Sequence, residues 1–90
     1  MAENPRGPVD AKDLDSHRPQ LLKYAMLQLR NHAQAEDVVQ ETMIAAIRGA
    51  QSFSGGSTVR TWLIGILKHK IIDTIRKASR EQSLDQDETS

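Results

Sequence analysis

The chain has 90 residues, of which 38% are hydrophobic, and its equal numbers of basic and acidic residues give a formal net charge of zero. This length supports a single domain with one modest core. The absence of cysteine excludes disulfides and thiolate metal sites, and no apolar run approaches the ~20 residues of a membrane span. Since the N-terminus also lacks the apolar core of a signal peptide, we expect a cytoplasmic protein that does not enter a membrane.

The charges are unevenly distributed along the chain. Residues 1–41 hold five basic and seven acidic residues, and residues 58–80 hold six basic residues and one acidic residue. Residues 81–90 hold four acidic residues and no basic one. This asymmetry suggests a polyanionic partner for one element and a different partner for another, although helical surfaces are charged in any case.

The first predicted helix covers residues 19–30. Before it, residues 1–16 contain two prolines and scattered charges without a helical period, so we expect a flexible lead-in. Pro19 suits a first helical position. An apolar stripe follows at spacings of three and four: Leu21, Leu22, Ala25, Met26 and Leu29.

The second predicted helix covers residues 33–50. Asn31 and Gln34 match the N-cap and third position of a capping-box variant. Residues with helical period are expected to face the core: Ala35, Val38, Val39, Thr42, Met43, Ala46, Ile47 and Ala50. The opposite side carries Asp37, Gln40, Glu41, Ile44 and Arg48. An apolar centre with a polar rim is typical of a protein-docking patch, but one exposed isoleucine is also common on an ordinary surface.

The third predicted helix runs from Ser57, as its N-cap, to about Ala78, after the loop "SFSGGST". We expect Gly65 to permit close packing beside Trp62, and residues 81–90 to form a polar tail. The residues expected to face the core are Val59, Trp62, Leu63, Ile66, Leu67, Ile71 and Ile75.

The third helix also carries most of the positive charge. Its cations can bind nucleic-acid phosphates, or they can form a basic surface whose last-turn charges favour the helix dipole. The glycine loop lacks the GK[ST] ending of a Walker A loop, so its two glycines are a weak signal by themselves.

Enzyme chemistry finds little support in the sequence. The three histidines are far apart, no HExxH motif is present, and no arrangement of a catalytic triad is legible. The paired carboxylates Asp37 and Glu41 lie on a face expected to be exposed, where raised pKa values are not expected. We therefore expect no catalytic residues, no cofactor and no metal site.

Three motifs in order resemble the core-binding domain, region 2, of an extracytoplasmic-function (ECF) sigma factor of the sigma-70 family: "AEDVVQET", "FSGGSTVRTWL" and "ILKHKIIDTIRK". The resemblance covers residues 17–80. It implies an all-α fold, a compact bundle of three main helices with a flexible N-terminal lead-in (residues 1–16) and a polar C-terminal tail (residues 81–90). Complete factors of this type also carry a second domain that reads the −35 element, and we expect that domain to be absent from this chain.

The resemblance implies a partner for each surface. Asp37, Gln40 and Glu41 would dock on the clamp coiled coil of the RNA polymerase β′ subunit, and Ile44 and Arg48 would extend that contact. The loop over residues 53–61 would capture a base flipped out of the non-template strand of the promoter −10 element. Its expected DNA contacts are Ser54, Gly55, Gly56, Ser57, Thr58 and Arg60.

On the third helix, Lys68, Lys70, Arg76 and Lys77 would hold phosphates. His69 stands where the family usually has asparagine, which leaves the base preference there open. An anti-sigma factor that masks these surfaces would be a further partner.

Two alternatives remain from the sequence. The first is a helical protein–protein adaptor, in which the basic helix is incidental and no salt-dependent binding to single-stranded DNA is expected. The second is a stand-alone helix-turn-helix DNA-binding module, for which the loop between the last two predicted helices is long.

Overall fold

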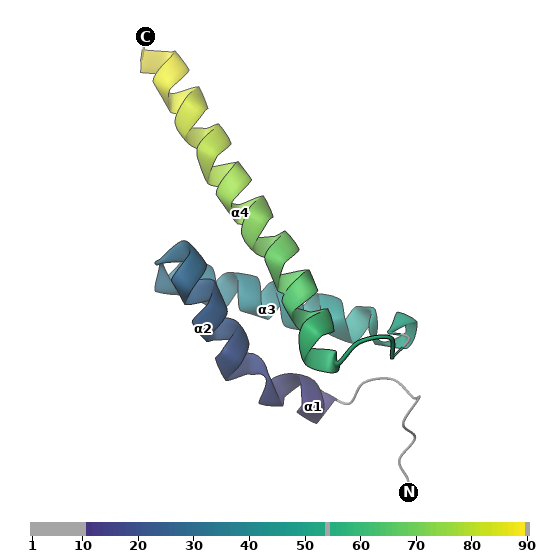
Figure 1. Cartoon of the computed structure of the whole chain (residues 1–90). Coiled ribbons are helices and arrows are strands. Elements are labelled where there is room, and N and C mark those ends of the chain that lie inside the picture. The colour runs from purple at the N-terminus through teal and green to yellow at the C-terminus, as the bar shows by residue number, and fades with distance from the viewer. Residues whose placement is uncertain (1–10, 54, 90) are drawn as a thin grey trace, which may run out of the picture.

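The computed structural model describes residues 11–53 and 55–89. This part of the chain contains four α-helices: α1 (Ala11–Ser16), α2 (Arg18–Leu29), α3 (His32–Arg48) and α4 (Val59–Thr89) (Figure 1). A 3-10 turn, η1 (Ala50–Ser52), follows α3. The predicted all-α fold with three main helices is confirmed.

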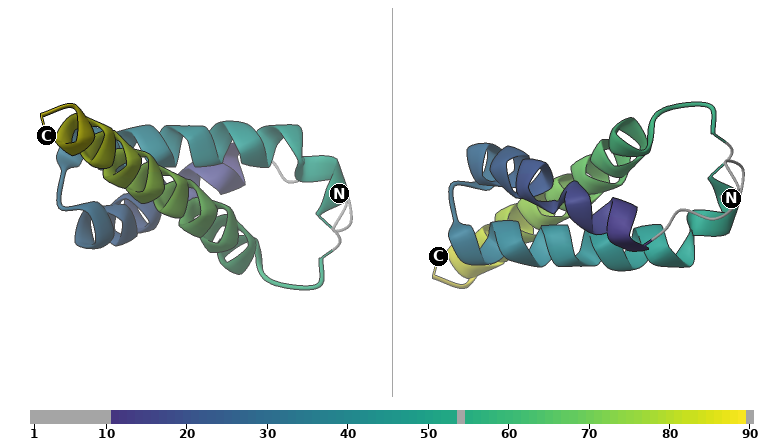
Figure 2. Two further views of the ribbon diagram at one scale, coloured as in Figure 1. Left: turned by 90° about the horizontal axis from the view of Figure 1, so that it is seen from above. Right: turned by 90° about the horizontal axis from the view of Figure 1, so that it is seen from below.

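Among the described residues, helix α3 contacts all three of the other α-helices. It packs against α2 and α4, which also contact each other, and α1 packs on α3 and α2 (Figure 2). At a rise of 1.5 Å per residue, the 31 residues of α4 extend about 46 Å. Its C-terminal part therefore projects beyond the shorter helices (Figure 1).

The core is built from the apolar stripes of α2, α3 and α4, to which α1 adds Leu14. Leu21, Leu63 and Leu67 are fully buried, as their spacing predicts. Thr42 is also buried, and its hydroxyl donates a hydrogen bond of 2.7 Å to the carbonyl of Val38, which satisfies the hydroxyl within the helix. The buried cluster consists of Leu14, Leu21, Ala25, Ala35, Val38, Val39, Met43, Ala46, Leu63, Leu67 and Ile71.

The turn between α2 and α3 follows the predicted capping pattern. The side-chain oxygen of Asn31 accepts a hydrogen bond from the backbone N–H of Gln34 at 2.8 Å, which confirms the predicted N-cap. Arg30 ends α2 in the left-handed region, with φ 55, and its N–H donates to the carbonyl of Met26 at 2.8 Å. The turn is thus only two residues long, which places α2 and α3 side by side.

The structure differs from the sequence prediction at the N-terminal segment. Residues 11–16 form α1, and its Leu14 is only 1% exposed within the core cluster. The two apolar residues of this six-residue helix, Ala11 and Leu14, are too few to establish a helical period, so the sequence does not reveal it. The rest of the predicted lead-in, residues 1–10, lies outside the described residues.

Helix α4 differs from its predicted bounds at both ends. The N-cap is Thr58 rather than Ser57, because the Thr58 hydroxyl oxygen accepts from the N–H of Thr61 at 3.1 Å. At the other end, the helix continues to Thr89 through the segment predicted to be a polar tail.

Three residues assigned to the core or to close packing face solvent instead. Ile47 is 58% exposed because it lies at the edge of the α3 stripe, and Ile75 is 49% exposed where α4 leaves the bundle. Gly65 is also exposed, and a Cβ there would meet no atom within 4 Å. It therefore makes no close packing contact beside Trp62.

Candidate functional site

The outer side of α3 carries the five residues predicted to dock on a protein. Asp37, Gln40, Glu41, Ile44 and Arg48 are all exposed, and we call them the docking surface. Their helical spacing places them on the side opposite the buried stripe. Ile44 is 42% exposed.

The apolar part of this surface is larger than the sequence indicates. Ile47, which follows Ile44 by three positions on α3, is also exposed. Two neighbouring isoleucines offer more apolar area to a partner than one. The docking surface therefore has the apolar centre and polar rim that are typical of a small protein interface.

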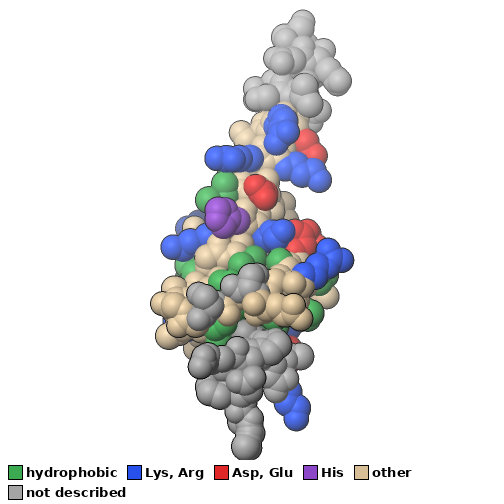
Figure 3. All heavy atoms as spheres, turned by 90° about the vertical axis from the view of Figure 1, so that its right-hand side faces the viewer, with side chains coloured by type: hydrophobic (Ala, Val, Ile, Leu, Met, Phe, Trp, Pro, Cys, Tyr) green, Lys and Arg blue, Asp and Glu red, His purple; other side chains and the backbone are tan. Residues whose placement is uncertain are grey.

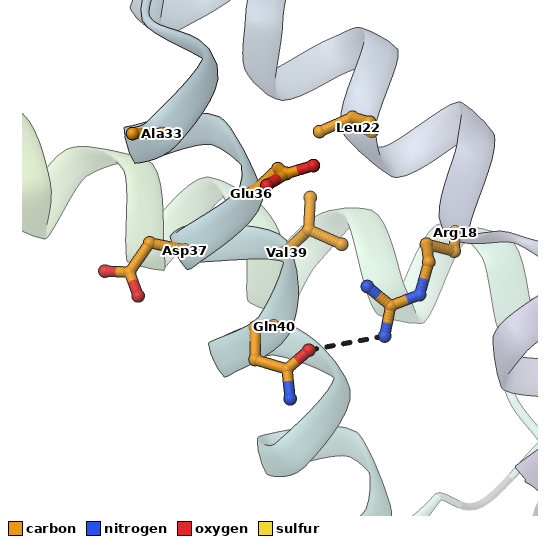
Figure 4. A pocket seen from close by; sticks show the side chains of 7 residues that line it. All are labelled: Arg18, Leu22, Ala33, Glu36, Asp37, Val39 and Gln40. Atoms are coloured by element: carbon orange, nitrogen blue, oxygen red, sulfur yellow. Dashed lines mark hydrogen bonds between the residues drawn. The ribbon is translucent and has the colours of Figure 1, made fainter.

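A hollow of about 500 Å³ lies beside the docking surface, between α2 and α3 (Figure 4). Its apolar lining includes Leu22 and Val39. Arg18 Nη2 donates to the side-chain oxygen of Gln40 at 3.4 Å, and Arg18 Nε donates to a carboxylate oxygen of Asp15 at 3.3 Å. With its oxygen turned to Arg18, the Gln40 amide directs its NH₂ group away, as Figure 4 shows.

The sequence did not identify Arg18 as part of this region. Arg18 and Gln40 are 22 positions apart, and only the packing of α2 on α3 brings them together. The hydrogen bond leaves two amide donors on Gln40 for a partner, beside the acceptor carboxylates of Asp37 and Glu41.

The loop between α3 and α4 is held at both ends. The rings of Phe53 and Trp62 pack with their centroids 4.8 Å apart, and the Thr58 hydroxyl is used in capping α4. Gly55 has a φ of 82, in the left-handed region that residues with a side chain adopt only at a cost in energy. Gly55 and three other predicted DNA contacts are exposed: Gly56, Ser57 and Thr58. The predicted contact Ser54 lies outside the described residues.

Arg60 lies in the first turn of α4, next to this loop. With Thr58, Thr61 and Ile64 it lines an open hollow of about 560 Å³. The loop, the hollow and the Arg60 guanidinium therefore occupy one end of α4. A negatively charged group is favoured at this end, because the N-terminus of a helix carries a partial positive charge.

The predicted DNA-binding cations of α4 lie on two different sides of the helix. Lys68 and Arg76 are exposed on the outer side, together with Ile72. His69 is exposed as well. Lys70 and Lys77 instead line a groove between α4 and α3, with lining residues that include Asp37 and Glu41 of the docking surface.

The described residues show neither a metal site nor a membrane-spanning helix. No cluster of three or more His, Asp or Glu side chains among them could hold a metal ion. No described helix is both long and apolar enough to cross a membrane.

Comparisons with known proteins identify the class of this helical domain. The family model for sigma-70 region 2 matches residues 14–81, so the chain belongs to the sigma-70 region 2 family. The chain is 37% identical to a probable RNA polymerase sigma factor of Haemophilus influenzae, over 87% of this chain and 42% of that protein.

Two further relatives carry the ECF name. The chain is 32% identical to the ECF RNA polymerase sigma factor SigX of Bacillus subtilis, over 70% of this chain and 32% of that protein. It is 37% identical to SigM of Mycobacterium tuberculosis, over 69% of this chain and 32% of that protein. The chain thus spans between 32% and 42% of the length of these relatives. No solved structure gave a significant match.

Proposed function

We propose that this domain is the part of an ECF-type RNA polymerase sigma factor that binds core polymerase and opens the promoter −10 element. The observation that carries the proposal is the presence of two exposed surfaces with different chemistry on adjacent helices. The docking surface of α3 has an apolar centre and acidic neighbours, whereas the outer side of α4 carries Lys68 and Arg76 around Ile72. The family and the names of its relatives support a role in transcription.

Core polymerase is the proposed partner of the docking surface. Ile44 and Ile47 would lose their exposed apolar area on binding, which favours association in proportion to the area removed from water. Asp37 and Glu41 would pair with cationic groups of the polymerase, and the outward NH₂ group of Gln40 would donate to an oxygen acceptor. The β′ clamp coiled coil is the segment that the family resemblance indicates.

Promoter DNA is the proposed partner of the loop and the outer side of α4. Extruding a base costs a few kcal/mol, and contacts in the pocket must offset that cost. The chain has three aromatic residues, and two of them, Phe53 and Trp62, pack against each other. Opening would therefore depend on capture of one base by the loop and on phosphate contacts of Arg60, Lys68 and Arg76, without covalent chemistry.

The first test is binding of the labelled domain to purified bacterial core RNA polymerase. We expect the wild type to bind, and the variant Asp37→Ala/Gln40→Ala/Ile44→Ala to lose at least about 2 kcal/mol, because it truncates the centre and the rim of the docking surface. A loss of this size raises Kd about 30-fold.

A matched triple variant provides the control. Gln20→Ala/Lys23→Ala/Leu27→Ala changes an amide, a charge and an exposed leucine on the outer side of α2, and it should bind as the wild type does. If the wild type does not bind core polymerase, the proposed function is wrong and a protein–protein adaptor becomes the better hypothesis.

A further inference from the structure

The groove between α3 and α4 has a charge pattern that neither proposed surface explains. It has a volume of about 450 Å³, and we call it the α3–α4 groove. Its charged lining residues are Asp37, Glu41, Lys70, Asp73, Lys77 and Glu81. Figure 3 shows acidic and basic side chains interspersed along α4 above the body of the molecule.

The balance of charge in the α3–α4 groove disfavours a phosphate. Four carboxylates face two ammonium groups, so the lining carries a net charge of −2. No ion pair within 4.0 Å joins Lys70 or Lys77 to a carboxylate of the described lining, but the opposite charges still lie in one groove. A phosphate drawn to Lys70 or Lys77 would therefore also meet the repulsion of the carboxylates.

The outer side of α4 provides a different environment. Lys68 and Arg76 are exposed there, eight positions apart, with the exposed Ile72 midway between them. Neither cation lines the α3–α4 groove. A DNA strand can approach Lys68 and Arg76 without entering the acidic groove.

The α3–α4 groove is also continuous with the docking surface. Asp37 and Glu41 belong to both, and Asp73 and Glu81 extend the same acidic character onto α4. A net negative groove that adjoins a protein-docking patch suits a partner segment of opposite charge, because complementary potentials favour association.

We propose that the polymerase-docking surface extends across this groove to Asp73 on α4, and that the groove receives a segment of core polymerase that presents lysine or arginine. This inference rests on the proposed function. It assigns Lys70 and Lys77 to the side that faces polymerase, where they moderate its negative charge, and it leaves Lys68 and Arg76 as the phosphate contacts of α4.

The first arm of the test measures binding to core polymerase without DNA. Asp73→Asn should raise Kd at least about threefold, whereas Asp13→Asn, the same substitution on exposed α1, should leave Kd unchanged. Lys70→Gln/Lys77→Gln should bind core as tightly as the wild type or more tightly, because it removes positive charge that opposes a cationic partner. A merely destabilising substitution would not strengthen binding.

The second arm measures the salt dependence of DNA binding. The probe is a labelled single-stranded oligonucleotide pool randomised at the −10 hexamer, titrated with the core–domain complex, with binding by core alone subtracted. Lys68→Gln/Arg76→Gln should reduce the slope of log K against log salt by about 1.4, since each phosphate contact on a single strand contributes about 0.7. Lys70→Gln/Lys77→Gln should change the slope by less than about 0.3.

The outcomes separate the inference from the proposed function. If the wild type binds core but Asp73→Asn binds equally well, or if Lys70→Gln/Lys77→Gln weakens binding to core, the extended surface is refuted. If Lys70→Gln/Lys77→Gln reduces the salt slope as much as Lys68→Gln/Arg76→Gln does, then Lys70 and Lys77 contact DNA. Their assignment to the side that faces polymerase is then wrong. Failure of the wild type to bind core contradicts the proposed function itself, and the extended surface with it.

Discussion

Leu14 provides a direct test of whether α1 belongs to the folded domain. Its side chain is 1% exposed in the core cluster, although its segment has no helical pattern in the sequence. In Leu14→Ala, removing three buried carbon atoms costs about 2.4 kcal/mol at about 0.8 kcal/mol each, and the cavity left behind raises the expected loss to about 3 kcal/mol. With a urea m value of about 1.5 kcal/mol/M, the unfolding midpoint should fall by about 2 M.

The matched control for Leu14→Ala is Leu27→Ala. Leu27 is 67% exposed on α2, so the same substitution there should change the free energy of unfolding by less than about 0.5 kcal/mol. Both variants are measured by circular dichroism in urea. Equal effects of the two substitutions, or a loss below about 1 kcal/mol for Leu14→Ala, would show that α1 does not contribute its leucine to the core.

Three further predictions concern the caps and glycines. Asn31→Ala should lower the free energy of unfolding by about 1 kcal/mol, while Asn31→Asp keeps the cap; urea unfolding of the pair checks this. In the same assay, Gly65→Ala should stabilise the domain by about 0.5–1 kcal/mol, since the added Cβ meets no atom, and a loss of stability would contradict the open position. Gly55→Ala should impair promoter opening with core polymerase, because φ 82 costs alanine about 1–2 kcal/mol. Gly55→Asn should retain more opening than Gly55→Ala, as 2-aminopurine fluorescence in the −10 element can measure.

Local patterns in the sequence predicted most of the helical structure. The capping pair Asn31 and Gln34 located the start of α3, because an N-cap depends on atoms three residues apart. The buried stripe of α3 was predicted for the same reason, since helical period is a local property. The prediction that this stripe is buried was wrong at Ile47, because exposure there depends on how far the neighbouring helices extend.

The family resemblance indicated which residues form the candidate site, and the structure shows which of them lie on the same surface. It gathers Asp37, Gln40 and Glu41 on one exposed side of α3, as the spacing predicts. The sequence prediction grouped Lys70 and Lys77 with Lys68 as phosphate contacts, but Lys70 and Lys77 line the α3–α4 groove and Lys68 does not. This difference depends on the packing of α3 against α4, which decides which side of α4 lines the groove.

The sequence by itself therefore determined the class of fold, the N-cap of α3 and the residue types available for binding. These depend on periodicity and capping, which act over one or two turns of a helix. Only the tertiary structure decided that Leu14 enters the core, that Arg18 holds Gln40, and that Lys70 lines a groove with carboxylates of α3. Each of these arrangements brings together residues from different helices, and their distance in space is set by helix packing rather than by their separation along the chain.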